Sequence, residues 1–226
     1  MNIRLLVFVI CVAIGAVSCK HSDVAPVRKT TDLNMVNATA NVLNLYQNGT
    51  RINNTSVINP GSVSGYLPVI YGAQKYQLKI AGNANPNYLF DPVELTLDTL
   101  KGYSLFVAGE TPDKLFLIND VISSTIPKTQ AAIRFVNTQP SITNLDVSID
   151  ALNYTNVAFT TATAFIGVAP GATSIKIHQA GLPTPTFDQT FTLVAGTIYT
   201  VFTTGTLAGT GTNMLTAKLS INGNIQ

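Results

Sequence analysis

The stretch Leu145-Asp146-Val147-Ser148-Ile149-Asp150 alternates between apolar and polar residues. A period of two residues places the apolar side chains on one face of a β-strand and the polar side chains on the other. The same alternation recurs at 76–80, 93–97 and 215–221. These runs predict strands with one face on a core and the other in solvent, so their apolar residues, up to Ile221, are expected inside.

The composition agrees with an all-β fold. Gly, Pro, Asn, Thr and β-branched residues are abundant, the helix formers Glu, Lys and Arg are scarce, and no long stretch has a helical period. Turn signals separate the alternating runs, at Asn48-Gly49, Pro60-Gly61, Lys101-Gly102, Pro170-Gly171 and Ala195-Gly196. Short strands at this spacing predict immunoglobulin-like β-sandwiches.

The sequence also repeats itself. Met35-Val36-Asn37 returns as Phe135-Val136-Asn137, and Gly72-Ala73 returns as Gly171-Ala172. A period of about 100 residues indicates two copies of one domain, because solenoid repeats are much shorter. We therefore expect a signal peptide at 1–18, a tether at 19–32, β-sandwich repeats at 33–122 and 131–226, and a linker at 123–130.

The motifs of the second copy resemble a known family. They are the opening strand 131–137, the strand 146–149 with its turn at Asp150-Ala151, and Val194-Ala195-Gly196-Thr197-Ile198-Tyr199 near the end. Together they resemble the domain-of-unknown-function 4397 family, and the first copy matches it more loosely. The resemblance implies exported bacterial proteins with immunoglobulin-like sandwiches and no established activity.

An export leader precedes the sandwiches. Arg4 is followed by an apolar run from Leu5 to Val17, and Ala16-Val17-Ser18 supply small residues ahead of Cys19. The run is shorter than the roughly 20 residues of a membrane-spanning helix, so we expect its removal. The leader resembles that of bacterial lipoproteins, which implies lipidation of Cys19. Cleavage as an ordinary secretory leader is the alternative.

Lipidation of Cys19 decides the expected location. The other cysteine, Cys11, is lost with the leader, so the mature chain is expected to have no disulfide. Lys20 does not resemble the inner-membrane retention signal of enteric bacteria, which favours the outer membrane, on either face. The Asn-rich, weakly charged composition resembles that of Bacteroidota. A formal net charge of +2 without a basic block gives nucleic acid binding no electrostatic support.

The sequence predicts no catalytic residue. Its two histidines are His21, in the tether, and His178, which we expect on a solvated strand face beside Lys176. A working base must be held within reach of its partners, and neither position predicts that. Gly61-Ser62-Val63-Ser64-Gly65 has valine where a nucleophile elbow has serine, so we expect a loop there.

Metal and cofactor sites are not predicted either. Asp146 and Asp150 share a strand face, but four residues separate them by about 13 Å, too far for one ion. We interpret them as solubilising charges. Gly209-Thr210-Gly211 lacks the residues that follow a phosphate loop, so we expect a loop tip.

Aromatic and amide residues gather in the first copy. Tyr66, Tyr71 and Tyr76 follow one another, and Asn83-Ala84-Asn85-Pro86-Asn87-Tyr88 is rich in amides. Tyrosine rings stack on sugars and amides bind hydroxyls, so a glycan site is one interpretation. The other is structural, because Tyr76 alternates with Leu78 into the core.

These observations predict a non-catalytic lipoprotein of the cell envelope rather than an enzyme, with tandem sandwiches acting in spacing, adhesion or protein interaction. The membrane, reached through lipid on Cys19, is the expected partner, and an envelope or surface protein or a glycan is a candidate. Two alternatives stay open: a glycan-binding accessory lipoprotein, and a subunit of a fimbria-like polymer in which strands exchange between copies.

Overall fold

The structure, a computed structural model, describes residues 29–225 apart from 54–55, 83–86, 100, 141–143 and 207–208. The fold is all-β, as the sequence predicts. The elements of the first half are β1 (Thr30–Asn37), β2 (Leu43–Gln47), β3 (Thr50–Arg51), β4 (Val63–Ile70), β5 (Gly72–Ile80), β6 (Val93–Leu97), β7 (Gly102–Val107), the 3-10 turn η1 (Pro112–Lys114) and β8 (Leu115–Asn119). Those of the second half are β9 (Ala131–Val136), β10 (Asn144–Ile149), β11 (Leu152–Ala158), β12 (Ile166–Val168), β13 (Gly171–Gln179), β14 (Phe187–Leu193), β15 (Thr197–Thr204), the 3-10 turn η2 (Gly211–Asn213) and β16 (Thr216–Asn224).

The two halves have one topology. Each consists of two four-stranded sheets, with orders β4-β1-β7-β8 and β3-β2-β5-β6 in the first half and β12-β9-β15-β16 and β11-β10-β13-β14 in the second. Every strand of the first half has its counterpart eight labels later, and the parallel pair β1–β7 returns as β9–β15. The predicted tandem immunoglobulin-like sandwiches are thus confirmed, and β1 begins at Thr30, within the expected tether.

The alternating runs supply the two cores. Leu145, Val147 and Ile149 are buried in one cluster, and Tyr76 and Leu78 in the other. Each core lies between the two sheets of its own sandwich, which holds the sheets together by burial of apolar surface.

The run at 215–221 departs from its prediction at the end. Ile221 is 60% exposed, whereas its polar neighbours Ser220 and Asn222 are buried. β16 is an edge strand whose register with β15 shifts near Ile221, and its supposedly solvated face is covered by the first sandwich. The prediction that Ile221 is a core residue was therefore wrong.

The hairpin turns match in the two copies. Asn48 and Asp150 both have positive φ, at 50° and 49°. The Asn48 carboxamide accepts the backbone N–H of Lys75, and the Asp150 carboxylate accepts that of Ser174. Both residues tolerate this conformation because a short polar side chain can bond locally.

The segment at 61–65, expected to be a loop, is partly strand. β4 begins at Val63, and the Ser64 hydroxyl accepts the backbone N–H of Met35 at 2.8 Å. This contact lies at a register shift between β1 and β4, where Gly65 has a φ of 71°. A bulge thus extends the pairing further than the sequence indicated.

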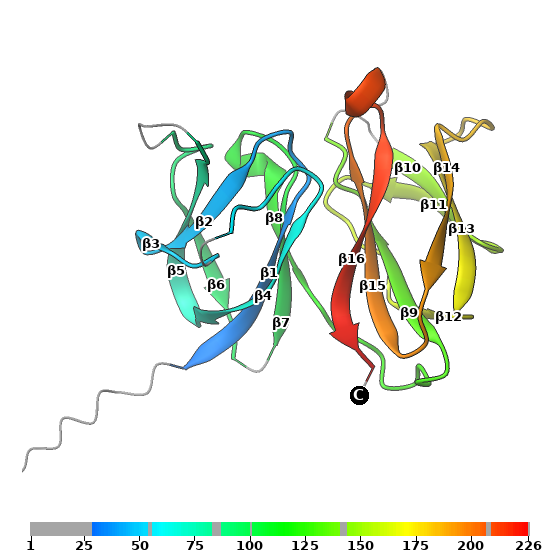
Figure 1. The fold of residues 1–226 in the computed structure, drawn as a ribbon, viewed down its shortest axis with the longest axis horizontal. Coiled ribbons are helices and arrows are strands. Elements are labelled where there is room, and N and C mark those ends of the chain that lie inside the picture. Colours follow the sequence, from blue (N-terminus) through cyan, green and yellow to red (C-terminus); the bar gives the residue numbers. More distant parts are fainter. Residues whose placement is uncertain are drawn as a thin grey trace, which may run out of the picture.

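One sheet of each sandwich faces the other sandwich (Figure 1). We call β4-β1-β7-β8 and β12-β9-β15-β16 the facing sheets and the other two the outer sheets. Val36 and Phe106 of the first half form a buried cluster with their counterparts Val136 and Phe202. The rings of Phe106 and Phe202 meet edge to face with centroids 6.5 Å apart. Since each half contributes the same positions, the contact resembles the interface of a symmetric dimer within one chain.

The segment between the sandwiches packs against the second of them. Residues 123–130 contain no strand, but Ile126 is buried with Ala132 and Ile198. The Gln130 carbonyl accepts the backbone N–H of Gly196 at 2.7 Å. The predicted linker is therefore held on the surface of the second sandwich.

Candidate functional site

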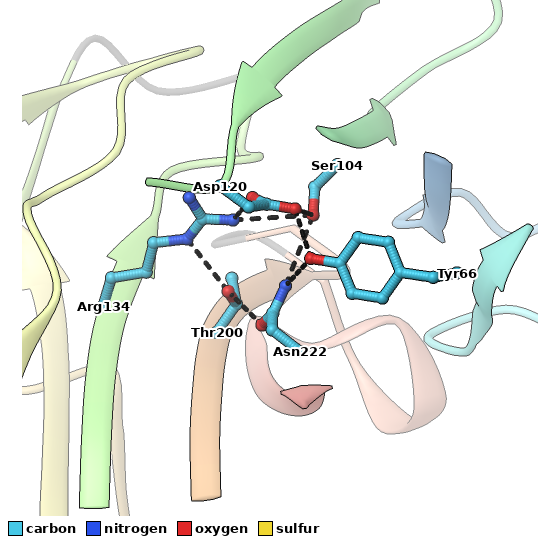
Figure 2. A network of polar contacts seen from close by, with 6 residues as sticks. All are labelled: Tyr66, Ser104, Asp120, Arg134, Thr200 and Asn222. Atoms are coloured by element: carbon cyan, nitrogen blue, oxygen red, sulfur yellow. Dashed lines mark hydrogen bonds and ion pairs between the residues drawn. The ribbon is translucent and has the colours of Figure 1, made fainter. Parts of the chain in front are cut away.

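A closed ring of polar side chains lies between the facing sheets (Figure 2). Arg134 of β9 forms an ion pair with Asp120, which follows β8. Tyr66 of β4 donates its hydroxyl to Asp120 at 2.5 Å and accepts the Asn222 amide at 3.1 Å. Asn222 in turn accepts a hydrogen bond from the hydroxyl of Thr200 at 2.6 Å. The Thr200 oxygen accepts a hydrogen bond from Nε of Arg134 at 2.9 Å. The ring therefore crosses from one sandwich to the other twice.

The ion pair in this ring is almost entirely removed from water. The side chains of Arg134 and Asp120 are each 2% exposed. Ser104 also donates to Asp120 at 2.8 Å, and the Arg134 guanidinium lies 4.4 Å from the centre of the Phe165 ring. A buried pair of charges is tolerated only where further hydrogen bonds satisfy both groups, as they do here.

The same surroundings act on the tyrosine of the ring. Burial, followed by the negative charge of Asp120, raises the pKa of Tyr66 well above that of a free tyrosine. The neutral hydroxyl is the form that donates to the carboxylate. Tyr66 thus stays protonated throughout the physiological range and fastens β4 to the second sandwich.

A cleft of about 550 Å³ opens where the facing sheets end. Equivalent segments of both halves line it, at 38–40 and 138–140 after β1 and β9, and at 108–110 and 204–206 at the ends of β7 and β15. Glu110 and Lys218 are its charged residues. Ligand sites are common at such junctions between domains, and this volume is in their usual range. The cleft is a candidate binding site.

Two equivalent asparagines shape the cleft. The Asn37 amide donates to the carbonyls of Asn41 and Ile58, and its oxygen accepts the backbone N–H of Thr39. Asn137 repeats the arrangement, accepting the backbone N–H of Gln139 at 2.9 Å. The Val-Asn motif that marked the repeat therefore fixes the chain where it leaves β1 and β9.

The three tyrosines proposed as a sugar platform do not lie together. Tyr66 belongs to the interface ring, and Tyr76 is a core residue whose hydroxyl accepts the amide of Gln47 at 2.8 Å. Burial raises the pKa of Tyr76 to about 12. Tyr71, at 40%, is the exposed member of the three, while residues 83–86 lie outside the described part of the chain. The inward assignment of Tyr76 is confirmed.

Asp146 of β10 and Asp150, which follows β10, have a structural role that the sequence did not indicate. Asp146 accepts the backbone N–H groups of Asn156 and Gly181 at 2.7 and 3.0 Å, and these bonds lower its pKa. Asp150 fixes the hairpin turn described above. The interpretation as merely solubilising charges was therefore wrong. His178 is half-buried, with Nε2 3.9 Å from Asp146 Oδ2.

Several predicted features lie outside the described residues. Cys19, His21, the signal peptide and most of the tether precede residue 29. Within the described ranges, no three His, Cys, Asp or Glu side chains are grouped to hold a metal ion. In the same part of the chain, no helix is long and apolar enough to cross a membrane. Gly209-Thr210-Gly211 lies in the loop between β15 and β16, as expected.

Sequence reasoning missed the interface ring. One signal for it was present in Ala131–Val136, where the residues on both faces of the strand are apolar except for Arg134. A strand that is apolar on both faces is buried on both faces. A charge in such a strand needs a buried partner, but the sequence did not show which acid provides it.

The fold and the ring define a class of protein: a tandem β-sandwich whose halves are joined by an internal, nearly symmetric interface. The model of one family, described as Domain of unknown function (DUF4397), matches residues 31–148 and 140–224. The chain belongs to this family, as its motifs predicted. A comparison with curated proteins gives no match.

Among solved structures, 11 chains match. One is a candidate cell adhesion protein from Bacteroides uniformis ATCC 8492, at 10% identity over 87% of this chain and 99% of that chain, with a TM-score of 0.25. Another is a candidate cell adhesion protein from Bacteroides fragilis NCTC 9343, at 10% identity over 85% of this chain and 97% of that chain, with a TM-score of 0.21. Likeness at this level carries no information about function.

Proposed function

We propose that this protein is a non-catalytic lipoprotein of the bacterial cell envelope, held in the outer membrane by lipid on Cys19. Its two sandwiches form one rigid body that acts in spacing, adhesion or protein interaction. The polar side chains of the ring bond to one another across the interface, which suits a role in holding the halves together.

One observation carries this proposal. β1 begins and β16 ends at one end of the molecule, whereas η2 and the loops that line the cleft lie at the opposite end (Figure 1). An anchor ahead of β1 therefore leaves the cleft at the end that faces away from the membrane. The buried ring and the aromatic contact keep the two halves, and so the two walls of the cleft, in one arrangement.

Fractionation of cells that express the tagged protein tests the anchor. The native chain should sediment with the membranes, and Cys19→Ala should be released, because one acylated residue carries the whole attachment. Cys11→Ala is the matched control, since it lies in the leader and should change nothing. A Cys19→Ala protein that still sediments with the membranes would overturn the proposal.

Protease treatment of intact cells then identifies the exposed face. Digestion of the native protein in intact cells would support an adhesive role at the surface. Protection until lysis would overturn that role and leave a periplasmic interaction with envelope proteins.

A further inference from the structure

The outer sheet of the first sandwich holds a cation between two aromatic rings. Lys79 Nζ lies 4.1 Å from the centre of the Tyr46 ring and 5.0 Å from that of Tyr88. Tyr46 is on β2, and Tyr88 forms an isolated bridge with Lys79 on the other side of β5. Tyr88 is 44% exposed, so one face of this cluster is open to solvent.

The strand pairing explains why these side chains meet. Leu45 and Leu78 pair across β2 and β5 and point into the core, so Tyr46 and Lys79 point to the opposite face. The backbone of Asn87 and Leu89 bonds to Ile80 and Leu78, which places Tyr88 at the edge of β5. The cluster is therefore built on strands rather than on a free loop.

A second cation stands beside the first. Arg51 of β3 pairs with Tyr46, and its guanidinium donates to the Asn53 side chain and to the Ser56 carbonyl. Among the described residues, neither Arg51 nor Lys79 forms an ion pair with a carboxylate. Two held cations without a counter-ion, flanking tyrosine rings, are complementary to an anion that also presents apolar ring faces.

The second sandwich shows that this chemistry is not a consequence of the fold. His178 stands where the first sandwich has Lys79, and it lies beside Asp146. Ser148 replaces Tyr46, and Lys176 pairs with Asp188 at 3.4 Å. On this outer sheet both Lys176 and His178 have acidic neighbours, and a serine stands in the place of the Tyr46 ring.

We propose that the outer sheet of the first sandwich binds an acidic polysaccharide. Lys79 and Arg51 face the carboxylates of its uronic acid units, and Tyr88 and Tyr46 stack on the sugar rings. This inference names the class of ligand that the proposed adhesive role would use. It rests on the proposed function only in that the location of the protein decides where it meets this ligand. An acidic peptide shares the charge but lacks the sugar rings that tyrosine faces recognise.

Calorimetric titration of the purified chain with oligogalacturonate tests the site. Binding should occur and should weaken as salt rises, because the cations are near the surface. Lys79→Gln should weaken it by about two- to fivefold, the range for a surface ion pair. Tyr88→Ala should weaken it by about fivefold or more, the range for a stacked ring. Lys176→Gln, the matched change on the other outer sheet, should leave it unchanged. Thermal unfolding of each variant checks that it is folded.

Three results would overturn the inference: no binding by the native chain, equal binding of polyglutamate, or equal affinities of the native chain and the two site variants. Binding of polyglutamate as tight as that of oligogalacturonate would point to an acidic protein partner instead. None of these results bears on membrane anchoring, which is measured separately in cells, so the two proposals can fail independently.

Discussion

The two sandwiches have the same strand order but different side chains on their facing sheets. Asn34 of β1 occupies the place of Arg134 in β9, and Asp120 occupies the place of Asn222. In the folded chain Arg134 meets Asp120, so each half supplies one charge. Two copies of the first sandwich packed in this way would offer Asp120 an asparagine, and two copies of the second would offer Arg134 an asparagine.

This difference explains how the first sandwich selects the second one, rather than another copy of itself, as its partner. A symmetric interface between identical copies pairs any copy with any other. Dividing one buried ion pair between the halves leaves an uncompensated charge in each like-with-like pairing, which disfavours it. The interface therefore favours the first sandwich against the second.

The largest expected effect comes from breaking this pair. Arg134→Ala should lower the free energy of unfolding by about 3–5 kcal/mol, because it leaves Asp120 buried without a partner. Urea unfolding measures the change. Lys176→Ala is the matched control, since its pair with Asp188 is exposed and should contribute about 1 kcal/mol or less. Equal effects of the two changes would contradict the conclusion that the ring stabilises the contact between the two sandwiches.

The equivalent position in the first sandwich should respond in the opposite direction. Asn34 is fully buried, and neither its amide nitrogen nor its oxygen has a partner among the described residues. Asn34→Leu has a similar volume and removes two unsatisfied polar atoms, so it should raise the free energy of unfolding by about 1–3 kcal/mol. The same urea titration measures this change. A loss of stability would show that the amide is bonded in the folded protein.

The smallest expected change in stability concerns Tyr66, whose equivalent in the second sandwich is Phe165. Phe165, just before β12, lies against Arg134 as Tyr66 lies beside Asn34, so Tyr66→Phe makes the first half more like the second. A raised pKa means that folding favours the neutral hydroxyl. The resulting stability is complete below the unfolded pKa of about 10 and is lost as the pH rises toward the folded value.

Unfolding measured at a series of alkaline pH values checks this expectation. The native protein should lose more stability above about pH 10 than Tyr66→Phe does, because only the native protein has this hydroxyl to ionise. Tyr71→Phe removes a hydroxyl from an exposed tyrosine instead and controls for the general effect of alkali. Identical pH profiles of the native protein and Tyr66→Phe would refute the assigned cause.

Local pattern was enough to predict several of the strands and most of the core residues that they supply. Period-two alternation at 145–150 and 76–80 told which side chains turn inward, because successive residues of a strand point to opposite faces. The Val-Asn and Gly-Ala matches revealed the duplication and, with the turn motifs, the family. The same reasoning failed at Ile221, because the polar face of β16 is covered by the first sandwich.

The amino-acid sequence alone was sufficient for the fold class, the duplication, the family and the positions of several turns, since each of these is visible in short local patterns or in their recurrence. What covers each outward face became known from the packing of the sheets. Tyr66 and Asn222, which meet in the ring, are 156 residues apart. Lys79 meets its two tyrosines only because β2 and the segment after β5 flank the same strand. Alternation says which way a side chain points, but its partner is set by how separate sheets pack.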